Sequence, residues 1–271
     1  RPWTYLNQVP GVVRALIKER PTHFLSTGSG RTAFVPFLLA KLLGKPFIHI
    51  DTFSIVHGYS KFGNFLLRLN HPILSQWEDE GNSKVTYIGP IFTNSDQAPD
   101  PAARSHVFVT LGTRSEPFTR LIDAVEDLVQ RGIIREKVIV QAGHTRYPSN
   151  NLEVFDYCTP DEIDGYIGRA KVVITQESAG IGTKCLKLKT PFLVMPRDYQ
   201  HGELPAASDM REDLHLKLEE MGYTKVVHSA AELESAIQVL DEIKTGFVFD
   251  NTLAIRMLNR IIQGRNIGMV E

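Results

Sequence analysis

The stretch VVITQESAGIGT, residues 172–183, decides which fold class the sequence predicts. Residues 172–175 are apolar or β-branched, and small residues with two glycines separate them from a helical pattern that runs to Lys189. An uninterrupted apolar strand that leads through a turn at 180–183 into a helix is typical of a parallel sheet covered by helices on both faces. We therefore expect an α/β fold.

The turn at Gly180–Thr183 is also the strongest candidate for a binding site. Glycines let backbone N–H groups approach a ligand, and a helix N-terminus adds free donors and partial positive charge, which suits a diphosphate. The Thr183 hydroxyl would add a further donor. A tight connection without any ligand explains the spacing equally well, because a lone Gly-x-Gly is a weak signal. Neither a P-loop lysine nor the third glycine of a dinucleotide fingerprint is present.

The same strand–turn–helix pattern recurs along the chain. Upstream, apolar strands are expected at 23–27 and 46–51, with a helix at 32–43 between them. Residues 90–104 are rich in Asn, Asp, Ser, Ala and Pro and form the best linker, after which the pattern restarts with a strand at 106–111.

This organisation predicts two Rossmann-like lobes with parallel sheets and a cleft between them. The first lobe would cover residues 1–97 and the second residues 105–250, followed by a C-terminal helix over 251–271. The chain begins without methionine, so we expect an N-terminal piece, with the first strands of this lobe, to be absent or supplied by another polypeptide.

Composition excludes several other classes of protein. The chain has 271 residues, 42% of them hydrophobic, and a net charge of −1, which gives no global attraction to nucleic acid. No apolar run reaches the ~20 residues of a membrane span. Two distant cysteines, Cys158 and Cys185, form neither a metal motif nor a disulfide framework, and this favours the cytoplasm. The histidines show no metal-ligand spacing, so no metal is expected.

Other polar or glycine-containing strand ends are further candidates. Gly112 and Thr113 follow the first strand of the second lobe, where the carboxyl ends of parallel strands face a ligand crevice. Arg197 and Glu203 lie in a polar loop after an apolar strand, and are candidates to pair with phosphate and to bind a sugar or ribose hydroxyl. A helix cap and a solvated loop are the competing explanations.

The first lobe carries its own set of candidates. The turn formed by Gly28, Ser29, Gly30 and Arg31 is placed to approach a pyrophosphate-bearing substrate. Asp51, at the end of a strand, is the best first-lobe candidate for a general base, although an aspartate there more often caps the following segment.

Two groups of short motifs follow one another in a fairly specific order. The first consists of Arg1-Pro2-Trp3, Arg20-Pro21, residues 26–30, residues 42–45, Gln76-Trp77-Glu78 and residues 87–90. It resembles the membrane-associated subunit of the bipartite N-acetylglucosaminyltransferase of lipid-linked oligosaccharide synthesis, and its relatives in exopolysaccharide assembly. The second consists of residues 108–113, Gln141-Ala142-Gly143, residues 179–183, Pro196-Arg197 and Gly202-Glu203. It is similar to the catalytic partner subunit, and to glycosyltransferase family 28.

The resemblance implies a fused GT-B glycosyltransferase, with the acceptor half first. A UDP-sugar, which serves as co-substrate without any other cofactor, would occupy the second lobe, and a polyprenyl-linked glycan the first. Such an enzyme would work at the cytoplasmic face of a membrane, by peripheral association or with a membrane subunit. The donor-binding residues it implies are Gly112, Thr113, Gln141, Gly143, Ser178, Ala179, Gly180, Ile181, Gly182, Thr183, Arg197 and Glu203.

Three departures from the family pattern accompany the resemblance. Ser178 replaces the histidine of the family's His-Ala-Gly, so that histidine's role is expected to be either lost or moved to Glu177. The helix after the loop is about two residues short and offers no clear ribose-binding glutamate, and the family's Asp-His-Gln reads Asp213-Leu214-His215.

The sequence thus predicts inverting, metal-independent transfer of a hexosyl group, with N-acetylglucosamine as the expected sugar. Asp51 and Glu177 are its candidate catalytic residues. A UDP-sugar 2-epimerase, which also uses two such lobes, and a non-catalytic scaffold partner of a glycosyltransferase are the alternatives.

Overall fold

A computed structural model of the chain describes residues 9–28, 30–78, 81–94, 100–205 and 213–264, without the side chain of Arg31. Two compact units make up the chain. One comprises the residues up to Thr93 together with those from Phe249 onward, and the other comprises Asn94–Val248. The C-terminal segment therefore belongs to the first unit.

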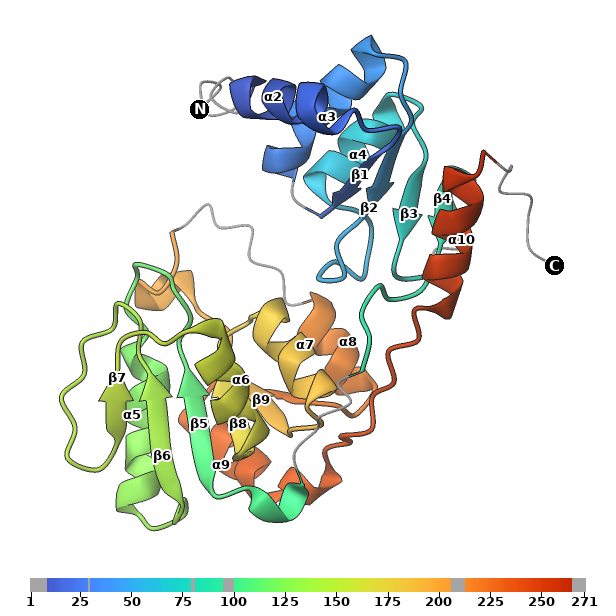
Figure 1. Cartoon of the computed structure of the whole chain (residues 1–271). Coiled ribbons are helices and arrows are strands. Elements are labelled where there is room, and N and C mark those ends of the chain that lie inside the picture. Colours follow the sequence, from blue (N-terminus) through green and yellow to red (C-terminus); the bar gives the residue numbers. More distant parts are fainter. Residues whose placement is uncertain (1–8, 29, 79–80, 95–99, 206–212, 265–271) are drawn as a thin grey trace. The chain divides into compact units, whose positions relative to one another are not determined.

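The first unit is built on a sheet of parallel strands in the order β1-β2-β3-β4 (Figure 1). Its elements along the chain are α2 (Val9–Glu19), β1 (Phe24–Thr27), α3 (Gly30–Leu42), β2 (Phe47–Ile50), α4 (Lys61–Arg68), β3 (Ile73–Ser75), β4 (Val85–Tyr87) and, at the far end, α10 (Thr252–Ile262). Helix α4 and strand β3 were not expected from the sequence. Strand β3 lies between β2 and β4 in the parallel sheet.

Helices cover both faces of this sheet. On one face, Phe37 of α3 and Phe62 of α4 pack with Phe47 of β2. On the other face, Ala254 and Met257 of α10 pack against apolar residues of β2 and β3 and against Ile88. Because successive strand residues point to opposite faces, His49 of β2 shares the face of Phe47 and lies against Phe62.

The second unit is a six-stranded parallel sheet in the order β10-β9-β8-β5-β6-β7 (Figure 1). Its strands are β5 (His106–Thr110), β6 (Lys137–Gln141), β7 (Glu153–Phe155), β8 (Ala170–Thr175), β9 (Phe192–Val194) and β10 (Lys225–Val226). Its helices are α5 (Thr119–Gln130), α6 (Pro160–Gly168), α7 (Ala179–Lys187), α8 (Asp213–Glu220) and α9 (Ala230–Gln238), with short 3-10 turns at Pro101–Ala103, Tyr199–His201 and Leu240–Glu242.

The core of the second unit explains why β5 and β8 read as continuous apolar runs. Val107, Val109 and Ile174 point to the face that α5 and α9 cover. Phe108 points to the opposite face and stacks on Tyr166 of α6 at 5.2 Å between ring centroids. Central strands covered on both faces bury every side chain, and all five residues of β5 are buried.

One sequence expectation about this unit is corrected. Residues Gly180–Thr183 are not a turn before a helix but lie within α7, which begins at Ala179 after the cap Ser178. Gly182 is buried, and a Cβ there would lie 3.5 Å from Phe192 of β9. Glycine by itself disfavours a helix, but the close packing of α7 on β9 requires a small residue at this position.

Candidate functional site

The carboxyl edge of the second sheet brings together the predicted residues of that unit. Gly112 follows β5, Gly143 follows β6, Glu177 follows β8 and Arg197 follows β9. Parallel strands direct their carboxyl ends to one edge, which is where open α/β sheets bind ligands.

The start of α7 is a partly accessible part of this edge. Ser178 is the N-cap, and its hydroxyl accepts a hydrogen bond from the Ile181 N–H at 3.4 Å. Gly180 is exposed, and a Cβ built on it would have Ser178 Oγ, 3.9 Å away, as its nearest neighbour. The N–H groups of the first helical turn precede any intrahelical acceptor, so Ala179 and Gly180 can donate to an anion.

The rest of the predicted loop faces inward. Gly182 and Thr183 are buried, and the space that a Cβ at Gly182 would need is bounded by Phe192 and by His215 Nε2, 3.4 Å away. Burial lowers the pKa of His215 to about 4, so this imidazole is neutral near pH 7. Residues 182 and 183 therefore pack α7 against the interior of the unit and are not exposed to a ligand.

Two glycines of this edge have positive φ, and other atoms of the chain occupy the space that a Cβ would need at each of them. Gly112 has φ +73°, and a Cβ there would lie 2.0 Å from the Gln176 side-chain nitrogen. Gly143 has φ +61°, and its Cβ would lie 2.4 Å from the Gly112 carbonyl oxygen. Gln141 is buried and accepts a hydrogen bond from the Thr110 hydroxyl at 2.5 Å. Thr113, in contrast, is exposed.

Arg197 is directed into the protein and not toward solvent. Its buried guanidinium donates to the carbonyl oxygens of Leu111 at 2.9 Å and Glu116 at 2.7 Å, and to the Gln176 side-chain oxygen. It also lies over the Phe118 ring. Internal acceptors occupy this side chain in the structure and fix the loop that follows β5, and the expected pairing with phosphate stays a prediction.

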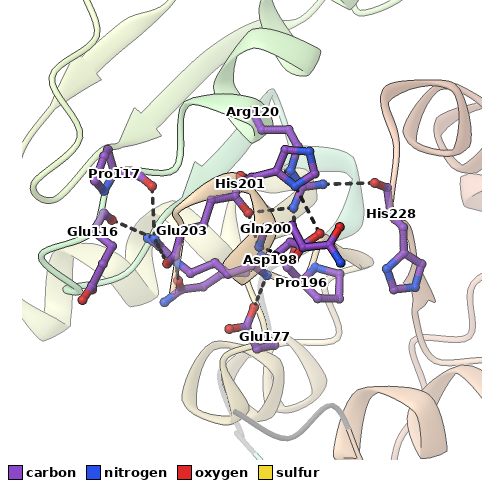
Figure 2. A network of polar contacts seen from close by, with 12 residues as sticks. Glu116, Pro117, Arg120, Glu177, Pro196, Asp198, Gln200, His201, Glu203 and His228 are labelled. Carbon is purple, nitrogen blue, oxygen red and sulfur yellow. Dashed lines mark hydrogen bonds and ion pairs between the residues drawn. The ribbon is translucent and has the colours of Figure 1, made fainter. Parts of the chain in front are cut away.

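Glu203 is likewise held by internal partners (Figure 2). Arg120 of α5 donates to both of its carboxylate oxygens, at 2.9 and 2.8 Å, and to the Pro196 carbonyl oxygen at 2.7 Å. The Asp198 N–H donates to the same carboxylate at 2.8 Å. A buried, bidentate pair of this kind orders the loop after β9 and leaves the Glu203 carboxylate satisfied without a sugar hydroxyl.

Glu177 differs from its neighbours because only one of its carboxylate oxygens is paired. Oε2 accepts from the Arg197 N–H at 2.8 Å, whereas the buried Oε1 makes no hydrogen bond within the described residues. Burial raises the pKa of Glu177, and the contact with Arg197 and the charge of Arg114 offset this only in part, so the pKa stays above its ordinary value. A carboxyl of this kind holds a proton more readily than an exposed one.

In the first unit, Asp51 is a cap and not an exposed base. Its carboxylate is buried and accepts from the N–H groups of Thr52 at 2.9 Å and Ser60 at 2.8 Å. Burial raises its pKa, but contacts with His49, Ser60 and Thr52 together hold the pKa below its ordinary value. Internal donors thus occupy this carboxylate in the structure, and its role as a general base stays a prediction. A Cβ at Gly63 would lie 2.7 Å from this carboxylate, which explains that glycine.

The predicted acceptor turn is described only in part. Gly28 has φ +71° after β1, and Gly30 opens α3 so close to Phe62 that a Cβ would lie 2.7 Å from that residue. Ser29 and the side chain of Arg31 lie outside the described residues.

Sequence reasoning missed Arg120 and Gln176, which hold Glu203 and Arg197 in place. A signal for Arg120 exists, because an arginine in the first turn of α5 opposes the helix dipole and therefore needs a partner elsewhere. Among the described residues, no group of three or more His, Cys, Asp or Glu side chains is arranged to hold a metal ion. Both cysteines are free.

Known structures share the fold of this chain. No protein-family model and no curated protein sequence matches it. MurG of Acinetobacter baumannii is 15% identical with a TM-score of 0.61, covering 97% of this chain and 79% of that one. The UDP-GlcNAc 2-epimerase of Methanocaldococcus jannaschii, solved with UDP-GlcNAc and UDP, is 13% identical with a TM-score of 0.58, covering 95% and 80%. The glycosyltransferase SnogD of Streptomyces nogalater is 14% identical with a TM-score of 0.58, covering 93% and 76%.

At such identities the likeness shows the fold alone. The predicted α/β fold of the GT-B type, with two Rossmann-like parallel sheets, is confirmed. The neighbours include both glycosyltransferases and epimerases, so the resemblance to one fused, two-subunit enzyme stays a prediction.

Proposed function

We propose that the chain is a UDP-sugar-dependent hexosyltransferase that moves N-acetylglucosamine to a polyprenyl-linked acceptor by an inverting, metal-independent reaction. The observation that carries the proposal is the start of α7. There, an exposed glycine, a capping serine and free N–H donors lie at the carboxyl edge of a parallel sheet.

These groups suit a departing diphosphate. Charge develops on the leaving group as the glycosidic bond breaks, and fixed N–H dipoles at a helix N-terminus stabilise such charge without having to reorganise. Arg197 contributes by holding the neighbouring loops in place, and Glu177, with its raised pKa, is the carboxyl next to this position that can carry a proton.

The nucleotide and the sugar are inferred from the fold neighbours. The M. jannaschii epimerase binds UDP-GlcNAc and UDP on a similar fold, and SnogD is a glycosyltransferase. We extend to this chain the chemistry that these proteins have in common, which is the handling of an activated sugar. The polyprenyl-linked acceptor is proposed from the motifs of the first unit.

Attachment to the cytoplasmic face of a membrane is part of the proposal. Within the described ranges, no helix is long and apolar enough to cross a bilayer. The first unit instead exposes Ile17, Leu42 and Leu43 beside Lys18 and Lys41 on α2 and at the end of α3. Apolar side chains interspersed with lysines suit peripheral binding to an anionic lipid surface.

A two-step experiment tests the function. A thermal-shift screen of UDP, GDP and CMP sugars should show stabilisation by UDP-GlcNAc, because a ligand that binds only the folded state raises its stability. Mass spectrometry should then find one added N-acetylhexosamine on a polyprenyl-diphosphate-linked acceptor. A reaction lacking the acceptor should leave the UDP-sugar intact.

A UDP-sugar 2-epimerase is the second candidate, and its support is the fold likeness to the M. jannaschii enzyme. An epimerase would convert or hydrolyse UDP-GlcNAc in the reaction without lipid, which is the outcome that distinguishes the two enzymes. A non-catalytic partner would give no stabilisation by any nucleotide sugar.

A further inference from the structure

Three side chains of the first unit form a line near the carboxyl end of its sheet. Ser26 of β1 and His49 of β2 are register partners, and Ser26 Oγ lies 3.3 Å from His49 Nδ1. On the other side of the ring, His49 Nε2 lies 3.7 Å from Asp51 Oδ1. A hydroxyl, an imidazole and a carboxylate are thus placed in the order in which a proton can be passed inward.

The three residues differ in accessibility. His49 is 0% exposed and Asp51 4% exposed, whereas Ser26 is only half-buried. Ser26 is therefore the one member of this line whose residue is in part open to solvent. This resolves the difficulty with Asp51 as a base, because a buried carboxylate can still act through groups that connect it to the surface.

The two ring nitrogens of His49 face different groups, with Nδ1 toward Ser26 and Nε2 toward Asp51. His49 Nε2 makes no hydrogen bond within the described residues, and the ring packs edge-on against Phe62, 5.0 Å between centroids. The other titratable groups nearby are His71, and Lys41 beyond it, and both interact electrostatically in the same cluster. Asp51 is thus the anionic group that faces this imidazole.

We propose that Ser26 is the group that activates the acceptor hydroxyl, with His49 and Asp51 as positioning residues behind it. The acceptor hydroxyl gives its proton to Ser26 Oγ while the Ser26 proton moves to His49 Nδ1. The acceptor oxygen then bonds to the sugar C1 as the bond from C1 to the UDP oxygen breaks, and UDP leaves with that electron pair. This inference rests on the proposed function and names the acceptor-side machinery of the same reaction.

Kinetics of three variants test the relay. Ser26→Ala should lower kcat by about 10²- to 10⁴-fold, the usual contribution of general base catalysis, with UDP affinity unchanged. Ser26→Thr retains a hydroxyl and should recover much of the rate. Thr27→Ala is the matched control, because Thr27 is the next residue of β1 with its side chain on the opposite face. Activity of Ser26→Ala within about threefold of the wild type would overturn the proposal.

An NMR measurement tests the relay without relying on transfer activity. In ¹⁵N-histidine-labelled full-length protein, the relay requires His49 to be protonated at Nε2 and to accept at Nδ1, and Ser26→Ala should shift the Nδ1 resonance. Protonation of neutral His49 at Nδ1 would contradict the proposal. If the wild type transfers no sugar, the proposed function fails. The NMR measurement still shows whether His49 carries its proton on Nε2, as the relay requires.

Discussion

At the scale of single residues, the two glycines Gly112 and Gly132 allow a matched test of the loop that Arg197 holds. Both have positive φ, but a Cβ at Gly112 would lie 2.0 Å from Gln176 Nε2, whereas Gly132 has no atom within 4 Å. Gly132→Ala should therefore cost about 1 kcal/mol of backbone strain. Gly112→Ala should cost more, because the Gln176 side chain, which also accepts from Arg197, must shift in addition to the strain. Urea unfolding measures both, and equal losses would contradict the packing described.

The raised pKa of Glu177 predicts a dependence of stability on pH. A carboxyl whose pKa is higher in the folded state destabilises the fold once it ionises, so its contribution worsens as pH rises from the unfolded pKa through the folded one. Glu177→Gln should therefore be more stable than the wild type at pH 7, and this difference should shrink at pH 4.

Denaturant unfolding at several pH values measures this effect, with Glu242→Gln as a control at an exposed carboxyl. A Glu177→Gln variant that is less stable than the wild type at pH 7 would mean that the ionised form is well compensated.

The sequence identifies which polar residues follow the strands but not where their side chains point. Arg197 and Asp51 are both correctly expected at strand ends, yet the guanidinium and the carboxylate are directed at internal partners. Those partners are backbone atoms from distant loops, such as the Leu111 carbonyl and the Ser60 N–H. Backbone acceptors and donors have no sequence signature, so the directions of these two side chains could be seen only in the folded structure.

At the scale of elements, the start of α7 makes a prediction that separates stability from binding. Ser178 caps α7 and Ser229 caps α9 by the same contact, from side chain to the N–H three residues on. Alanine at either position should cost about 1 kcal/mol of unfolding free energy. UDP affinity should fall about 10- to 150-fold for Ser178→Ala only, because a lost hydrogen bond to a charged group costs about 1.5–3 kcal/mol. Equal affinities in calorimetry would place UDP elsewhere.

Elements with strong periodicity could be read from the sequence, and those with weak signals could not. Strands β5 and β8 are continuous apolar runs and were expected close to their observed bounds. Helix α4 contains Gly63 and Asn64, both poor helix formers, and β3 is three residues long, so local patterns reveal neither. Glycines likewise suggested a turn where α7 begins, because the packing of Gly182 on Phe192 is a tertiary effect.

At the scale of the whole molecule, the return of the C-terminal segment to the first unit predicts where core mutations act. Met257 of α10 is buried in the first unit, and Leu233 of α9 is buried in the second. Each change to alanine should cost about 2–5 kcal/mol. Hydrogen exchange should rise around β2 and β3 in Met257→Ala and around β5 in Leu233→Ala. Increased exchange in the second unit for Met257→Ala would contradict the division into units.

The two-sheet organisation was predictable because the linker composition at 90–104 interrupts a repeated strand–helix pattern. The destination of α10 was not, since an amphipathic helix shows that one face is buried without showing against which sheet. Its contacts with Ile48, Leu74 and Ile88 join residues about 165–210 positions apart in sequence, as the core cluster shows.

Calorimetric titration of UDP into the wild type, Gly180→Ala and Gly180→Asp tests most directly whether the start of α7 holds the donor diphosphate. Gly180 is exposed and helical, so both substitutions fit, and an aspartate in the first turn even favours the helix. The wild type and Gly180→Ala should bind UDP alike, whereas Gly180→Asp should lose binding through charge repulsion while its thermal stability is unchanged. Equal UDP affinity in Gly180→Asp would contradict the account.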